Sequence, residues 1–83
     1  MTRAPGVPGE PPRVAFAIGR PVGNAVARNR LRRRLRALCR EQVGDFAPGH
    51  AYLIGAAPGA ADVPYSELGS TLRELLARTA SAR

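Results

Sequence analysis

The segment from Asn24 to Arg40 most constrains the fold, because its apolar residues follow the spacing of a helix. They recur every three or four positions, at Ala27, Leu31, Leu35 and Leu38. This is the stripe that an amphipathic helix buries. Asn24 is a suitable N-cap, and Gly44 suits the position just past the C-terminal end. We therefore expect one helix of roughly 20 residues, about 30 Å long, with one face packed against the rest of the chain.

The opposite face of this predicted helix is cationic. It carries Asn29, Arg33, Arg36 and Arg40 at helical spacing, with Arg32 beside them and with Arg28 and Arg30 at the two edges. From Arg13 to Arg40 there are nine arginines and no acidic residue. A merely solvated helix face normally mixes arginine with glutamate, because like charges four residues apart repel. The unrelieved row predicts a polyanionic partner, since guanidinium groups bind phosphate well.

Two short apolar runs flank the predicted helix. Val14–Ile18 lies before Gly19 and is rich in β-branched and aromatic residues, and His50–Gly55 ends before a Pro-Gly turn. A strand, a helix and a second strand make a βαβ unit with parallel neighbouring strands. A last helix is expected from Ser66, with a leucine stripe that can lie across the sheet. The expected fold is α+β, a small βαβ-containing sandwich with helices packed on a short sheet.

The first residues have a different composition. Residues 1–12 contain four prolines and two glycines, which disfavour both helix and sheet. We expect 1–12 to be a disordered lead-in and 13–80 to form a single domain, because 83 residues allow only one small core.

Several other classes of protein are disfavoured by the sequence. No nucleophile with a paired base is visible, and His50 stands alone without further metal ligands, so we expect no catalytic and no metal-binding residue. The single cysteine, Cys39, suits a reducing cytoplasm. No apolar run approaches the roughly 20 residues of a membrane span, and no signal peptide is seen. Lipid binding is disfavoured because the leucine stripe lacks aromatic anchors, which leaves nucleic acid as the expected partner. The cysteine usage and the lack of a membrane or signal segment indicate the cytoplasm as the expected location.

The residues from Val22 to Arg36 resemble the signature of the bacterial ribonuclease P protein component, with Arg28-Asn29-Arg30 as its core. Arg13–Ile18 is similar to the strand that precedes this signature. Tyr52–Ile54 and the predicted helix from Ser66 to Arg78 also resemble the family in order and spacing. The likeness covers about residues 13–78, and it implies a ribosomal-protein-like fold with a left-handed βαβ crossover in place of the usual right-handed one.

This resemblance implies a protein cofactor of a ribozyme. In the family the catalytic RNA removes the 5′ leader from precursor tRNA with bound magnesium, and the protein supplies no catalytic side chain and binds no cofactor of its own. The implied partners are the catalytic RNA and precursor tRNA, without a membrane or an inferred protein partner. Asn24, with Gly23, would shape the entry to the helix, and Arg20 would lie near the substrate or the RNA backbone. The RNA-binding residues implied on the helix are Arg28, Asn29, Arg30, Arg32, Arg33, Arg36 and Arg40.

The sequence departs from the family pattern at two places. The family usually has a helix and a first strand where this chain has only residues 1–12, so a bare sheet edge and weaker leader binding are expected. Gly19-Arg20-Pro21 stands where the family often has Ser-Lys-Lys. Two alternatives therefore remain open: a truncated relative that binds RNA without supporting cleavage, and a general arginine-rich module that binds ribosomal RNA or a membrane surface.

Overall fold

The computed structural model describes residues 1–81 of the 83-residue chain. Three strands and two long helices follow one another as β1 (Thr2–Pro5), β2 (Arg13–Ala17), α1 (Ala25–Glu41), β3 (His50–Gly55) and α2 (Tyr65–Ser81). Single-turn 3₁₀ helices occupy the connections at Arg20–Val22, Val43–Asp45 and Ala60–Asp62. The predicted elements are all present: the strand His50–Gly55 has the predicted bounds, and the other boundaries are shifted by one to three residues. The predicted position of Gly44 just past the helix end is wrong, because α1 ends at Glu41 with Gln42 as its C-cap, and Gly44 lies within the following 3₁₀ turn.

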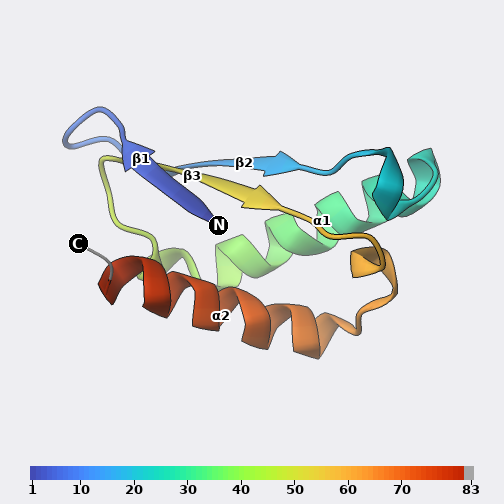
Figure 1. The fold of residues 1–83 in the computed structure, drawn as a ribbon. Coiled ribbons are helices and arrows are strands. Elements are labelled where there is room, and N and C mark those ends of the chain that lie inside the picture. The colour runs from blue at the N-terminus through green and yellow to red at the C-terminus, as the bar shows by residue number, and fades with distance from the viewer. Residues whose placement is uncertain (82–83) are drawn as a thin grey trace.

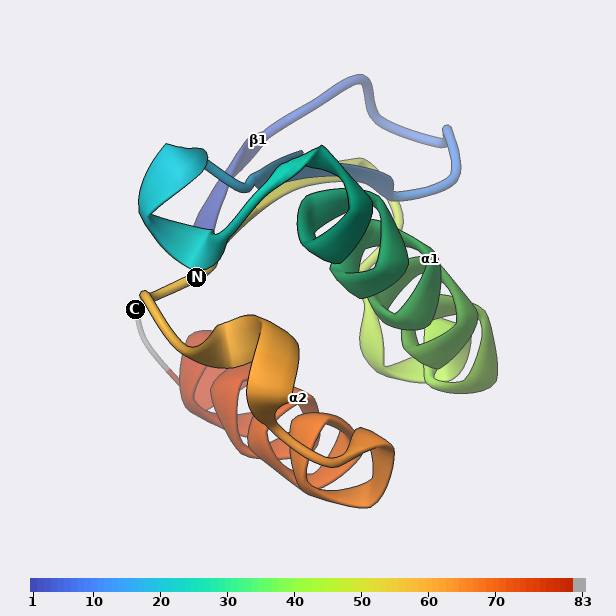
Figure 2. The ribbon, with the colours of Figure 1, turned by 90° about the vertical axis from the view of Figure 1, so that its right-hand side faces the viewer.

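The sheet has the strand order β1-β3-β2, with β3 in the centre. β2 and β3 are parallel, with Val14 opposite Tyr52 and Phe16 opposite Ile54. This pairing confirms the predicted βαβ unit, since α1 connects the two strands. Both helices lie on the same side of the sheet and run side by side beneath it (Figures 1 and 2). The expected α+β architecture is confirmed, and the left-handed sense of the crossover stays a prediction.

Residues 1–12 contain a strand, so the expectation of a disordered lead-in with a bare sheet edge is wrong. β1 pairs antiparallel with β3, with Thr2 opposite Leu53 and Pro5 opposite His50. The Gly6 N–H donates to the carbonyl of Gly49 at 2.9 Å, and the Gly49 N–H donates to the carbonyl of Glu10 at 2.8 Å. Proline is tolerated here because Pro5 stands at the end of an edge strand and the other prolines fall in the loop beyond it.

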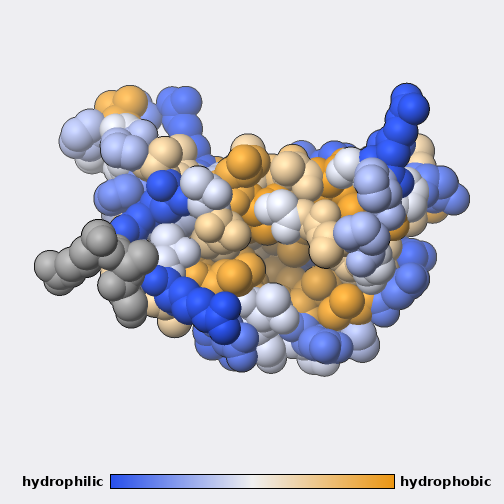
Figure 3. Space-filling model, in the orientation of Figure 1, coloured by the Kyte–Doolittle hydropathy of each residue, from blue (hydrophilic) through white to orange (hydrophobic). Residues whose placement is uncertain are grey.

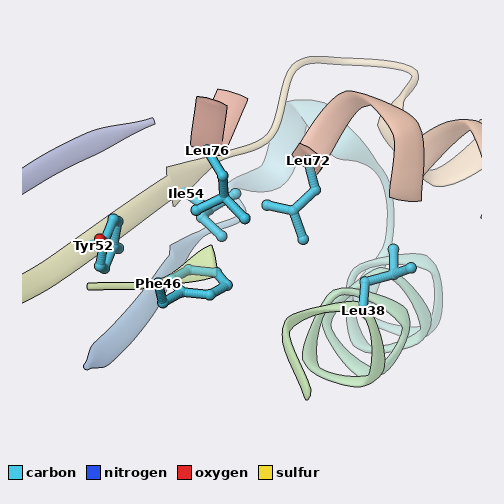
Figure 4. Close-up of a cluster of buried hydrophobic side chains, with 6 residues drawn as sticks. All are labelled: Leu38, Phe46, Tyr52, Ile54, Leu72 and Leu76. Carbon is cyan, nitrogen blue, oxygen red and sulfur yellow. The ribbon is translucent and has the colours of Figure 1, made fainter. Parts of the chain in front are cut away.

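The main core lies between the sheet and the two helices, where apolar side chains are visible between the strands and α2 (Figures 3 and 4). It joins side chains from α1, the following turn, β3 and α2, namely Leu38, Phe46, Tyr52, Ile54, Leu72 and Leu76. The Phe46 and Tyr52 rings meet edge to face with their centroids 4.9 Å apart, a favourable aromatic geometry. The Tyr52 hydroxyl accepts a hydrogen bond from the Ala47 N–H at 2.8 Å, so the only polar atom of that side chain is paired.

A second core cluster holds the N-terminal half of α1 in place. It consists of Ile18, Val22, Leu31, Leu35 and Ala61, all buried. Between them, the two clusters bury Leu31, Leu35 and Leu38, which are the three leucines of the predicted stripe. The rotation of α1 about its axis is thereby fixed, and the residues opposite these leucines must face outward.

The two helices approach each other closely near Gly69 of α2. A Cβ atom at this position would lie 3.1 Å from Cδ2 of Leu38. The Gln42 side chain, 7% exposed, bridges the same gap by donating from Nε2 to the Gly69 carbonyl at 3.0 Å. Among residues 1–81, no partner is found for the buried Oε1 of Gln42.

The other face of the sheet is open. Ala15 and Ala17 of β2 are exposed, and Leu53 of β3 is 45% exposed. The alternation of buried and exposed residues along β2 and β3 follows from the two-residue period of a strand whose sheet is covered on one side.

Candidate nucleic-acid interface

A short, tightly built turn directs the chain into α1. Gly23 has a φ of 151°, and a Cβ atom there would lie 3.0 Å from that of Ala27, so glycine is required on both counts. Asn24 caps the helix, because its Oδ1 accepts from the Ala27 N–H at 2.9 Å. The N-cap predicted from the sequence is confirmed.

The outward face of α1 carries the predicted polar row. Arg33, Arg36, Arg40 and Asn29 are exposed, and Arg32 is half-buried beside them. Four of these five line one shallow hollow of about 410 Å³ together with a valine; its lining residues are Val26, Asn29, Arg32, Arg33 and Arg36. The structure thus gathers the polar row on one surface of α1, which we call the arginine face; it consists of Asn29, Arg32, Arg33, Arg36 and Arg40.

The remaining predicted residues of the region lie around this face. Arg30 is exposed and Arg28 is half-buried, and neither lines the hollow. Arg20 is exposed on the 3₁₀ turn that precedes α1, and its carbonyl accepts from the Gly23 N–H at 3.1 Å. The observed hydrogen bond of the Asn24 side chain is the helix cap. Contact of these four residues with RNA stays a prediction.

The guanidinium groups of α1 are not neutralised by carboxylates within residues 1–81. The ion pair found in that range joins Arg13 and Glu10 at 3.2 Å, outside the helix. On α1 itself, Arg32 donates from Nη1 to Oδ1 of Asn29 at 3.1 Å. An unpaired row of charges of one sign produces a positive potential over this surface, which attracts phosphate groups most strongly at low salt.

Val26 is a residue of this surface to which the sequence analysis gave no role. It is 72% exposed, the most exposed of the large apolar residues in the structure's described part. Its signal in the sequence is its position three residues before Asn29, seven before Arg33 and ten before Arg36, which places it on the same helical face.

Other candidate sites offer less chemistry. His50 Nδ1 lies 3.1 Å from the carbonyl of Pro48. In residues 1–81 there is no group of three or more histidine, cysteine and acidic side chains placed to hold a metal ion. Burial raises the pKa of the half-buried Cys39 thiol, which keeps it protonated and unreactive at neutral pH. No helix in this described range has the length and apolar character that a membrane span needs.

A three-stranded sheet backed by two helices, one of which presents an unpaired arginine row, defines a small α+β protein with a cationic helical surface. A match to a known protein family narrows this class to one family. The chain belongs to the Ribonuclease P family, whose model matches residues 3–80. The match begins within β1 and covers the loop that follows it.

The relatives found by sequence are ribonuclease P protein components of bacteria. The chain is 47% identical over 66 residues to that of Thermobifida fusca, which covers 80% of this chain and 45% of the relative. It is 40% identical over 75 residues to that of Streptomyces avermitilis, which covers 90% of this chain and 61% of the relative. The chain therefore spans about half to three fifths of the length of these relatives.

Solved structures support the fold. The RNase P protein from Thermotoga maritima superimposes with a TM-score of 0.80 at 21% identity, covering 92% of this chain and 72% of that one. The RNase P protein of Staphylococcus aureus gives a TM-score of 0.73 at 20% identity, covering 84% of this chain and 63% of that one. The arrangement of two helices on a mixed three-stranded sheet is thus shared with proteins of the same family.

Proposed function

We propose that this chain is the protein subunit of ribonuclease P, which binds the catalytic RNA and assists endonucleolytic removal of the 5′ leader from precursor tRNA. The observation that carries the proposal is the arginine face of α1, without carboxylate partners in the described structure, on a chain of the Ribonuclease P family. Under this proposal α1 neutralises RNA phosphates, and the cleavage chemistry with its magnesium belongs to the RNA. The protein would act in the cytoplasm.

Precursor tRNA is the second proposed partner. The open face of the sheet supports it, because Ala15 and Ala17 leave the backbone accessible beside the half-exposed Leu53. A flat surface of small apolar side chains accommodates an extended RNA strand, and Arg13 stands at its border, at the start of β2, in an exposed ion pair with Glu10. Arg20 lies past the other end of the same strand.

Reconstitution tests the main proposal. Cleavage of a precursor tRNA by ribonuclease P RNA at low magnesium is measured with and without this chain, and addition of the chain is expected to raise the rate. The double variant Arg33→Ala/Arg36→Ala should lose most of this gain. Arg73→Ala/Arg78→Ala is the matched control, since it removes the same charge from exposed positions of α2 and should keep the gain.

The outcomes separate the alternatives. RNA binding without any rise in cleavage would favour a chain that binds RNA but no longer supports catalysis. Equal affinity for ribonuclease P RNA, ribosomal RNA and anionic vesicles would instead indicate a general arginine-rich module. Equal loss in the two double variants would show that total charge, and not the arginine face, carries the activity.

A further inference from the structure

Val26 occupies a position that the folding of the chain does not explain. A β-branched residue lowers helix propensity relative to alanine, and Val26 lies in the first turn of α1 with 72% of its surface exposed. It belongs to neither buried cluster nor to the side chains packed against them. An apolar side chain held in water beside arginines gains free energy only when a partner covers it.

The hollow around Val26 is lined by both apolar and polar side chains. Its lining combines one apolar side chain with the amide of Asn29 and the guanidinium groups of Arg32, Arg33 and Arg36. The hollow is shallow and open to solvent, with a volume of about 410 Å³, so a group bound there is covered by the protein on one side only.

Asn29 adds directed hydrogen-bond donors to this hollow. Its Oδ1 accepts from Arg32 Nη1 at 3.1 Å. Because arginine can only donate, this bond fixes which end of the amide is oxygen, and the Nδ2 group is left to present its two N–H donors elsewhere. Such donors match the acceptors of a nucleobase, a ribose hydroxyl or a phosphate.

We propose that this hollow binds one unpaired nucleotide of the RNA, with the base or ribose covering Val26, the Asn29 amide donating to it, and the flanking phosphates held by Arg33 and Arg36. In a continuous duplex the base faces are stacked and hidden, whereas unpaired nucleotides expose apolar faces that protein side chains can cover. The assignment rests on the proposed RNA-binding function, and it adds a contact that responds to RNA structure rather than to charge alone.

Affinity and salt dependence test the proposal on the assembled complex. Val26→Ala is expected to weaken binding to ribonuclease P RNA by about three- to tenfold, with an unchanged slope of log affinity against log salt, because no phosphate contact is lost. Arg33→Ala should weaken binding and also flatten that slope by about 0.7 to 0.9. Val43→Ala is the matched control, since Val43 is 59% exposed on the turn after α1 and should leave affinity unchanged.

Loss of folding does not confound the first variant, because alanine favours a helix more than valine does. Circular dichroism is expected to show equal or higher stability for Val26→Ala, opposite in direction to its effect on RNA binding. An affinity equal to that of the wild type for Val26→Ala, while Arg33→Ala weakens binding, would overturn the inference and leave the proposed function intact. Wild-type binding that does not prefer ribonuclease P RNA over unrelated RNA would instead overturn the proposed function.

Crosslinking tests whether the contacted nucleotide is unpaired. Cysteine replaces Val26 in a Cys39→Ala background, carries an azidophenacyl group, and is irradiated in the complex with ribonuclease P RNA. Crosslinks are expected at a bulge, loop or junction nucleotide, and a Val43→Cys variant should not give them. Crosslinks spread along a continuous duplex would show that the hollow follows phosphates only, which contradicts the inference.

Discussion

At the scale of single residues, Asn24 is the clearest case in which a sequence position fixes local structure. Its side chain caps α1 through the 2.9 Å bond to the Ala27 N–H, and the preceding Gly23 leaves no room for a side chain. Both features could be predicted from the sequence, because helix caps and glycine turns depend on the chemistry of neighbouring residues. The exposure of Val26 could not be predicted in the same way, since it depends on how the whole helix is rotated against the core.

Asn24→Ala is expected to lower the free energy of unfolding by about 1 kcal/mol, because the first turn of α1 loses its side-chain cap. Urea unfolding followed by circular dichroism measures the change. Asn29→Ala is the control: it removes an asparagine from the exposed middle of the same helix, where alanine has the higher helix propensity. A loss of similar size in both variants would show that the cap contributes nothing specific.

Cys39 makes stability depend on pH in the alkaline range. Burial raises the pKa of its thiol above the ordinary value of 9.0. The folded chain therefore holds this proton more tightly than the unfolded chain, so its stabilising contribution is complete below pH 9 and is lost as pH rises through the folded-state pKa. Urea unfolding in reducing buffer at pH 7 and at pH 10 should show a smaller decline for Cys39→Ala than for the wild type. Equal declines would mean that other groups control the alkaline loss.

At the scale of elements, the contact between α1 and α2 depends on Gly69. A larger side chain at this position would clash with Leu38, because even a Cβ atom would lie 3.1 Å from Cδ2 of Leu38. Gly69→Leu is expected to destabilise the fold by about 2 kcal/mol or more through overpacking. Thermal unfolding measures this, with Gly44→Leu as the control, since a Cβ at Gly44 meets no atom within 4 Å. A similar loss in the control would assign the effect to leucine itself.

The elements also show which parts of the fold a sequence can predict. The helix α1 and the parallel pair β2 and β3 were expected because their periodicity and breakers are local signals. The strand β1 was missed because its residues carry no alternating pattern and contain a proline. Its partner lies almost fifty residues away in β3, and the main-chain hydrogen bonds that form the pair leave no mark on residue type.

At the scale of the whole molecule, a net charge of +7 on 83 residues couples stability to polyanion binding. A ligand that binds only the folded chain at 100 times its dissociation constant adds about 2.7 kcal/mol, which for a domain of this size raises the melting temperature by roughly 10 to 20 °C. Ribonuclease P RNA should produce this shift at low salt and lose it in 1 M salt.

The charge-matched double variants serve as the control in the melting experiment. Arg33→Ala/Arg36→Ala should show a smaller RNA-induced rise than Arg73→Ala/Arg78→Ala, because the first pair lies on the arginine face and the second on α2. Identical rises in melting temperature would mean that RNA binding depends on net charge and not on the position of the arginines.

Tyr52 lies on β3, with its ring against Phe46 and its hydroxyl bonded to the Ala47 N–H, and this fixed position makes it an intrinsic optical probe of the fold. The chain has two tyrosines and no tryptophan, and Tyr65 is 38% exposed whereas Tyr52 is 4% exposed. Any ultraviolet signal that requires a rigid, asymmetric environment around a phenol ring must therefore come mainly from Tyr52. The near-ultraviolet circular dichroism of the unlabelled protein thus reports whether sheet and helices have docked.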